Sequence, residues 1–282
     1  MRKVFFTVVA VILAAIMVFP LLITVTSSFM GDKEVMENYT SLENTGIGKE
    51  NEFMSFRLIP EGVTLRQYYE VLIGKNKYLR MFWNTCFMVL PLVLGQVFVS
   101  SMAAFAFSKL KFKYRDFLFF LYIIIMLMPF QVTLVPNFLM LDRLGLINSY
   151  GSIILPGIFS TFGVFLLKQF MDGIPNECIE AAAVDGCNVF QIFHKIILPL
   201  SKEGIAALFI LFFIENWNMV EQPLNFLKDI NKYPLSLYLS HVNKFELGIA
   251  FASGVVYMIP MFLIFLYGEN YLTEGIKNSN IK

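Results

Sequence analysis

The segment EAAAVDGCNVFQIFHKIILP, residues 180–199, lies between two apolar runs that each approach the length of a membrane span. Residues 144–167 before it carry no charge, and residues 204–220 after it carry only Glu215. About 20 apolar residues in a helix cross the ~30 Å hydrocarbon core of a bilayer. We therefore predict that residues 180–199 belong to a polar, helix-prone loop between two transmembrane helices.

The rest of the chain shows the same alternation of long apolar runs and polar segments. Hydrophobic residues make up 57% of the 282 residues and charged residues 15%, whereas a soluble domain averages ~25% charged residues. Backbone polar groups in lipid must be satisfied within the segment, which favours helices. We predict an all-α integral membrane protein, a single domain over residues 1–282 with six transmembrane helices. Their approximate ranges are 4–29, 84–108, 117–141, 148–170, 204–221 and 247–268.

The distribution of charge predicts which segments face the cytoplasm. The segment 109–115, between the second and third apolar runs, carries four Lys or Arg residues. Short segments rich in Lys and Arg stay in the cytoplasm, and Arg2 and Lys3 before the first run agree. We expect a multi-pass protein with both termini, and the loop at 171–203, on the cytoplasmic side. The first run is about twice as long as the apolar part of a signal peptide, so we expect it to remain as a helix.

Several classes of function find no support in the sequence. A net charge of +1 gives no indication of a nucleic-acid partner. His194 and His241 lie far apart in sequence, and the three cysteines suggest no disulfide framework. No Gly-x-x-x-x-Gly-Lys-Ser/Thr phosphate loop occurs, so the chain shows no conventional means of hydrolysing ATP. We predict no catalytic residues, no metal site and no cofactor in this chain.

The loop has the pattern of two short helices joined by a turn. Residues 177–184 favour a helix because they contain three consecutive alanines and an acidic residue in the first turn. Asp185 and Gly186 indicate a turn, Asn188 is suited to cap a second helix, and Pro199 is expected to end it. The second helix has an apolar stripe at Val189, Ile192, Phe193, Ile196 and Ile197.

This pattern is compatible with two arrangements. An amphipathic pair of helices is able to lie on the membrane surface. Alternatively, it docks in a groove of a soluble partner. The residues of the loop alone do not decide between the two.

Several blocks of sequence resemble one family of transport proteins. The loop residues Glu180-Ala-Ala, Asp185-Gly186, Ile192-Phe193 and Leu198-Pro-Leu resemble the EAA motif of ABC-importer permeases. The similarity is strongest to the carbohydrate-uptake branch, which includes the maltose and glycerol-3-phosphate permeases, and it extends over nearly the whole chain. The chain departs from the pattern at Cys187, Met219 and Glu221. Further matching blocks are Met128-Pro129 with Pro136, Leu144–Asn148, Ile154-Leu-Pro156, Trp217-Asn218 with Pro223-Leu224, and Tyr271–Gly275.

The resemblance implies a division of labour between this chain and its partners. The loop would form coupling helices that dock on a separate ABC ATPase dimer, which binds the ATP. The resemblance also implies a second permease subunit, which we expect to differ from this chain, and an extracellular or periplasmic sugar-binding protein. The location would be the bacterial cytoplasmic (inner) membrane. The implied coupling residues are Glu180, Ala181, Ala182, Asp185, Gly186, Phe193 and Pro199.

Polar residues inside the apolar runs are candidates for a substrate path. Glu215 is an acid in the fifth run, where a charge is costly and often functional. The residues that follow it combine hydrogen-bonding groups with an aromatic ring, as sugar recognition requires. Structural pairing between helices, or a position near the membrane interface, is the alternative interpretation. The candidate residues are Gln131, Asn137, Glu215, Asn216, Trp217 and Asn218.

Other patterns predict packing and outer structure. Small residues at Ser100, Ala104 and Ser108 favour close approach of helices. The segment 30–56 is expected to be lightly structured, and Thr64 is a plausible N-cap for a helix over residues 64–72.

Two further classes of multi-pass protein have to be considered. An ion-coupled secondary carrier is favoured by several intramembrane acids and repeated halves. A membrane-embedded enzyme needs a convergent catalytic set. We find one intramembrane acid, no internal repeat and no such set, which favours the importer permease.

Overall fold

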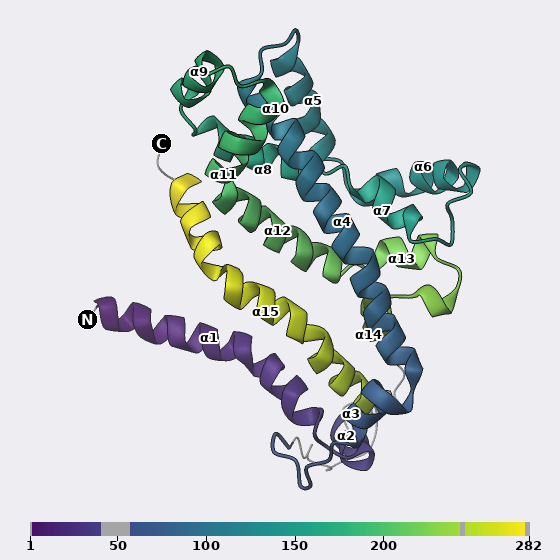
Figure 1. The fold of residues 1–282 in the computed structure, drawn as a ribbon. Coiled ribbons are helices and arrows are strands. Elements are labelled where there is room, and N and C mark those ends of the chain that lie inside the picture. Colours follow the sequence, from purple (N-terminus) through teal and green to yellow (C-terminus); the bar gives the residue numbers. More distant parts are fainter. Residues whose placement is uncertain (1, 41–56, 243–245, 280–282) are drawn as a thin grey trace. The chain divides into compact units, whose positions relative to one another are not determined.

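All regular secondary structure in the part of the chain that the structure describes is helical. The computed structural model describes residues 2–40, 57–242 and 246–279 (Figure 1). The chain divides into two compact units, the first comprising Met1–Trp83 with Leu237–Ile259 and the second Asn84–Ser236 with Pro260–Lys282. Two long helices, α4 (Asn76–Lys109) and α15 (Leu247–Ser279), contribute to both units.

The helices confirm an all-α membrane protein and give four to six candidate spans. Four segments are long and apolar enough to cross a membrane: Lys3–Ser27, Asn76–Lys109, Gly151–Asp172 and Leu247–Glu269. Two bent pairs bring the number to six if each pair is one span. These pairs are Arg115–Met126 with Phe130–Arg143, and Val189–Leu200 with Lys202–Trp217. The count of six therefore remains a prediction.

The predicted third span, 117–141, is two helices with a sharp bend. Helix α5 (Arg115–Met126) ends just before Pro129, and α6 (Phe130–Arg143) follows at 99° to it. Pro129 has extended backbone angles, φ −67° and ψ 144°. Proline lacks an N–H and keeps the residue before it out of the helical region, so the helix ends here.

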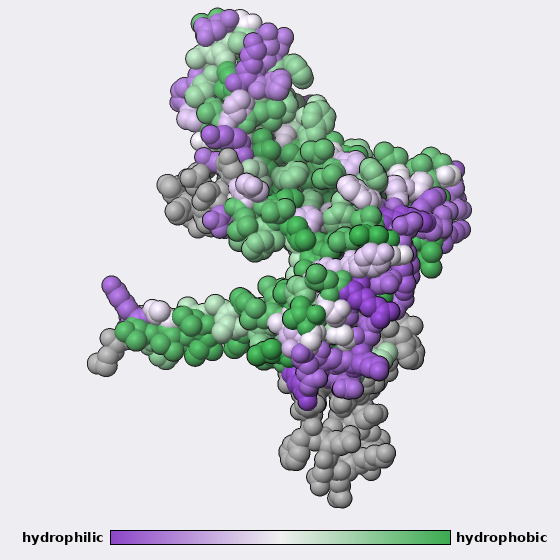
Figure 2. Space-filling model, turned by 60° about the horizontal axis from the view of Figure 1, so that its bottom comes forward, coloured by the Kyte–Doolittle hydropathy of each residue, from purple (hydrophilic) through white to green (hydrophobic). Residues whose placement is uncertain are grey.

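In the first unit, α1 (Arg2–Ser27) is almost entirely exposed within the chain. Apolar side chains cover its length (Figure 2), and none of its most apolar window is buried. A helix that is apolar all round requires an apolar environment. We therefore interpret α1 as a helix surrounded by lipid or by another subunit.

The outer segment is more ordered than expected where the structure describes it. Residues Asp32–Thr40 form α2, with Asp32 and Glu34 in the first turn, where acids suit the helix dipole. The expectation of a lightly structured segment was therefore wrong for α2, whose Val35 is fully buried; residues 41–56 lie outside the described part. The expected helix after Thr64 begins as α3 (Arg66–Tyr69) and continues as the π turn η1 (Glu70–Gly74). Thr64 Oγ1 accepts the Arg66 N–H at 3.2 Å, although Leu65 is the N-cap.

The second unit packs α4 closely against α8 (Thr161–Asp172) and α12 (Lys202–Trp217). Ser100 and Ala104 of α4 are fully buried. A Cβ on Gly163 of α8 would lie 2.7 Å from the Phe212 ring of α12 and would also collide with Ser100 Oγ. The small residues of α4 therefore serve packing inside this chain, as predicted. The unit also contains α7 (Gly151–Gly157) and α13 (Glu221–Phe226).

Candidate functional site

The first helix of the loop, α9 (Asn176–Val184), ends in a left-handed turn at Gly186, as the sequence predicts. Gly186 has a φ of +81°, which L side chains rarely adopt. The Cys187 N–H donates to the Ala182 carbonyl at 3.0 Å, and the Gly186 N–H donates to the Ala183 carbonyl at 3.1 Å. These two bonds form a Schellman motif. A Cβ on Gly186 would meet no atom within 4 Å, so the glycine serves the turn and not close packing within this chain.

The second helix of the loop begins at a capping box. Asn188 Oδ1 accepts the Gln191 N–H at 2.8 Å, and Gln191 Oε1 accepts the Asn188 N–H at 2.9 Å. The helix runs through α10 (Val189–Ile192), the π turn η2 (Phe193–Ile197) and α11 (Leu198–Leu200). The predicted cap at Asn188 is therefore confirmed.

Pro199 lies in the last turn of this helix, which ends at Leu200, one residue after the predicted end. The chain bends by 76° after this turn, at Ser201, before α12 begins. The proline ring crowds the carbonyl four residues earlier and supplies no N–H. Both effects favour the end of the helix at this point, and the π turn η2 lies directly before the proline.

The predicted coupling residues separate into a buried and an exposed group. Ala182 and Phe193 are buried beneath the loop. The apolar stripe contributes Ile192 and Ile197 to the same buried face, whereas Val189 is exposed. The exposed coupling residues are Glu180, Ala181, Asp185, Gly186 and Pro199.

Two large apolar side chains on the loop face outward and were not predicted to be functional. Val184 is 87% exposed at the end of α9, and Phe190 is 70% exposed on α10. Val189 beside Phe190 is 53% exposed. The sequence did hold a signal, since Phe190 lies off the apolar stripe and Val184 precedes a polar turn. Leu200 at the end of the loop is also exposed, so large apolar side chains face outward along the loop.

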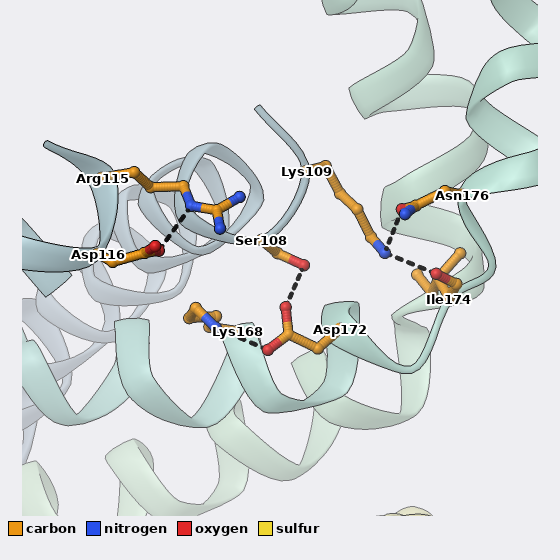
Figure 3. A network of polar contacts seen from close by, with 8 residues as sticks. All are labelled: Ser108, Lys109, Arg115, Asp116, Lys168, Asp172, Ile174 and Asn176. Atoms are coloured by element: carbon orange, nitrogen blue, oxygen red, sulfur yellow. Dashed lines mark hydrogen bonds and ion pairs between the residues drawn. The ribbon is translucent and has the colours of Figure 1, made fainter. Parts of the chain in front are cut away.

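A network of polar contacts fastens the start of the loop to the end of α4 (Figure 3). Lys109 Nζ donates to the Ile174 carbonyl at 2.6 Å and to Asn176 Oδ1 at 3.2 Å. Asp172, the last residue of α8, accepts from Ser108 Oγ and from Lys168 Nζ, both at 2.7 Å. The Lys168 and Asp172 side chains are 18% and 29% exposed, so this ion pair is partly shielded from water.

The end of α4 also contacts the second helix of the loop through aromatic rings. The Phe105 and Phe193 rings lie 5.2 Å apart between centroids, and both side chains are buried. An apolar pocket of about 360 Å³ opens beside them. It is lined by Met102, Phe105, Ala106, Leu110, Val189, Phe190 and Phe193.

One candidate path residue on α6, Gln131, contacts the start of α13. Gln131 is exposed, and its Nε2 donates to both carboxylate oxygens of Glu221 at 3.2 Å. Glu221 was seen in the sequence only as a departure from the family pattern. Asn137 lies two turns further along α6 and is half-buried.

The candidate residues at the end of α12 point in different directions. Glu215 and Asn218 are exposed. Asn216 is half-buried, and its Nδ2 donates to Gln96 Oε1 of α4 at 2.9 Å. Trp217 is only 1% exposed and stacks on Phe213 with ring centroids 5.0 Å apart. Trp217 is thus a core residue in this structure, because its ring is surrounded by its own chain.

Asn148 holds together the loops at one end of the second unit. Its φ of +62° is left-handed, a conformation in which asparagine is enriched. Its Oδ1 accepts the N–H groups of Lys228 and Asp229 at 3.0 and 2.9 Å. Its backbone N–H donates to the Phe226 carbonyl, and its carbonyl accepts from Lys232 Nζ. Sequence reasoning missed this role because the partners lie 78 or more positions away.

The fold and the loop together define the class of protein. Long apolar helices with a structured polar loop describe a multi-pass helical membrane protein. The family of binding-protein-dependent transport system inner membrane components matches residues 96–275, and this chain belongs to that family. The predicted ABC-importer permease is confirmed: the chain is a transport permease of the inner membrane and not an enzyme, which also excludes the secondary carrier.

Known relatives resemble the chain over most of its length. The arabinooligosaccharides transport system permease protein AraQ of Halalkalibacterium halodurans is 30% identical, with 96% of this chain and 93% of that protein covered. AraQ of Bacillus subtilis is 32% identical over 79% of this chain and 80% of that protein. The sn-glycerol-3-phosphate permease UgpE of Brucella abortus is 27% identical, with 78% and 82% covered.

A solved structure shares the fold. It is a crystal structure of a bacterial ABC transporter involved in the import of the acidic polysaccharide alginate, and the match has a TM-score of 0.78. The match covers 96% of each chain at 22% sequence identity, which establishes the fold alone.

Proposed function

We propose that this permease forms part of the translocation path for an oligosaccharide, and that its loop couples transport to a separate ATPase. The relative that covers almost the whole of both chains is named for arabinooligosaccharide transport, and this supports the sugar class. Arabinooligosaccharides are therefore the substrates that we favour. ATP would be bound by the partner, since we predict no nucleotide site in this chain.

The exposure of Val184, Val189 and Phe190 is the observation that best supports the ATPase contact. Large apolar side chains in water forgo about 25 cal/mol per Å² of favourable burial, and clustered ones mark contact sites. The exposed Glu180 and Asp185 lie on the same loop and would form a polar rim. Acidic groups are repelled by the anionic inner leaflet, which favours a protein groove over the membrane surface.

Removing the Phe190 ring should weaken the ATPase contact. An exposed aromatic side chain that becomes buried in a partner typically contributes about 2 kcal/mol, so we expect Phe190→Ala to lower the affinity about 30-fold. The measurement is affinity purification of the tagged permease from native membranes, followed by titration of the purified ATPase onto it.

Phe120→Ala is the matched control, because it removes the same ring from an exposed position on α5, within a predicted membrane span. Its ATPase affinity should equal that of the wild type. Equal affinities for Phe190→Ala and the wild type would show that this ring does not reach the ATPase. Absence of any ATPase from the wild-type complex would overturn the proposed function itself.

The same purified complex tests the remaining partners. We propose a second, different permease subunit, a sugar-binding protein on the outer side, six spans and cytoplasmic termini. The exposed apolar length of α1 supports a partner or lipid around the first span. Mass spectrometry should find two permease species for each ATPase dimer. A single permease species in the intact complex would contradict the heterodimer.

The proposed substrate path uses the exposed polar side chains of the second unit. These are Glu215 and Asn218 at the end of α12, and Gln131 with its partner Glu221. Asn137 is half-buried on the same helix as Gln131 and is kept as a candidate. Asn216 would act by positioning, through its bond to Gln96. Trp217 is not proposed as a contact, because its ring is buried within the chain.

Neutralising Glu215 should weaken substrate use without stopping transport. A hydrogen bond to a charged group contributes about 1.5 kcal/mol, so Glu215→Gln is expected to raise the KM for arabinotriose uptake about 10-fold. Uptake is measured in proteoliposomes that contain the whole transporter. Asp142→Asn, at the exposed end of α6, is the control and should leave the KM unchanged. An unchanged KM and maximal rate for Glu215→Gln would remove this residue from the path.

A further inference from the structure

The last turns of α4 contact both helices of the loop, although α4 is separated from the loop in sequence. Lys109 bonds to the Ile174 carbonyl just before α9 and to Asn176, its first residue. Phe105, four residues earlier, packs on Phe193 of the second helix. The two contacts are different in kind, one polar and one aromatic. If the loop moves as a rigid body, it would therefore displace α4 through two contacts, at Lys109 and at Phe105.

The middle of α4 contacts the end of α12, where the proposed path residues lie. Gln96 is 7% exposed, and its Nε2 donates to the Gly157 carbonyl at 2.9 Å. Its Oε1 accepts from Asn216, the residue directly after Glu215. Residues 96 and 109 are 13 positions apart, which is about 20 Å along a helix. One end of the stretch 96–109 thus contacts the loop, and the other end, ~20 Å away, contacts Asn216 beside the proposed substrate path.

The stretch of α4 between these contacts has the features of a rigid helix. Residues 96–109 contain neither proline nor glycine, the usual causes of a kink. Ser100 and Ala104 within it are fully buried. Gly163 of α8 lies so close to Ser100 that a Cβ on the glycine would collide with the serine Oγ. Close-packed interiors shift between discrete arrangements and do not deform continuously. The stretch therefore meets the requirements of a rigid transmitting element.

We propose that residues 96–109 of α4 transmit the movement of the loop to the substrate path, with Lys109 and Gln96 as positioning residues at its two ends. The proposal rests on the proposed function, because it assumes that an ATPase moves the loop. The loop is also continuous in sequence with α8 and α12, which offer a route of their own. The two routes differ in one respect: only the route through α4 requires the Lys109 contacts.

The test measures the response of the path to nucleotide and does not depend on the sugar. Cys86, Cys178 and Cys187 are replaced by serine, and Asn218→Cys introduces an exposed reporter at the end of α12. The whole transporter is assembled with its ATPase. The rate of labelling by a water-soluble maleimide is then compared between the nucleotide-free state and the state trapped with ADP and vanadate.

We expect nucleotide to change the labelling rate in the parent and Lys109→Met to abolish this change, while the ATPase remains bound. The side chain of methionine has a similar length but donates no hydrogen bond. Lys109→Arg should restore the response, because a guanidinium is able to donate to the same two oxygens. Gln96→Leu, at the other end, should abolish it in the same way.

Lys111→Met is the matched control, since it removes the same charge from an exposed position two residues away. It should respond like the parent. A normal response in Lys109→Met, or loss of ATPase binding in that variant, would overturn the proposal, the second because Lys109 would then serve docking alone. Failure of the parent to bind the ATPase would overturn the proposed function as well.

Discussion

Gly186→Val is expected to lower the affinity of the permease for its ATPase about 100-fold. A left-handed conformation costs an L residue about 1–2 kcal/mol, and a β-branched residue more. Loss of the two bonds to the Ala182 and Ala183 carbonyls adds about 1 kcal/mol for each bond that breaks. The total of about 3 kcal/mol corresponds to roughly two decades in affinity. Titration of the ATPase onto the purified permease measures this affinity for the variant and for the wild type.

Gly186→Asn distinguishes two reasons for a glycine at this position: the left-handed turn, and close approach of the partner's backbone. Asparagine tolerates the left-handed conformation, and its Cβ would meet no atom of this chain within 4 Å. If the turn alone matters, the asparagine variant should bind almost like the wild type. If the ATPase backbone approaches Gly186 closely, asparagine should fail as badly as valine. Wild-type affinity for the valine variant would show that this turn is not needed for docking.

Asn148→Ala is expected to destabilise the second unit by about 3 kcal/mol. The substitution removes the acceptor of the Lys228 and Asp229 N–H groups and places alanine at a positive φ. Thermal unfolding of the purified permease in detergent, followed by tryptophan fluorescence, should show a lowered midpoint. The loss of stability should be largest in residues 226–232, which Asn148 contacts.

Two substitutions at the same position divide this effect into its parts. Asn148→Asp keeps the accepting oxygen and tolerates the left-handed conformation, so its midpoint should lie close to that of the wild type. Asn148→Gly accepts the conformation but lacks the side chain, so it should lie between aspartate and alanine. If alanine and aspartate unfold alike, the Oδ1 contacts do not stabilise this end.

The sequence predicted the local features of the loop well. A run of alanines before Asp185 and Gly186 determines a short helix with a glycine turn, and the structure has both. Asn188 three residues before Gln191 determines the second cap, although only Asn188 was identified. Such features depend on residues within one or two helical turns, which is why a sequence reveals them.

Predictions that depended on distant neighbours were less successful. Trp217 has the chemistry of a sugar contact, but the stacking partner Phe213 and the surrounding core bury it. The expectation of a lightly structured segment after Met30 was wrong for α2, because packing of Val35 stabilises a helix that polar composition does not reveal.

The sequence by itself determined that this protein is a helical membrane permease with a polar loop of two short helices. It did so because membrane-length apolar runs, charge clusters and capping residues act locally, and the family motif is read in order along the chain. Only the tertiary structure decided which side chains of the loop are exposed. It also decided that α4 contacts the loop through Lys109 and Phe105. It also decided that Asn148 binds a segment 78 or more positions away. These relations arise from contacts between distant segments, and residue order alone does not specify them.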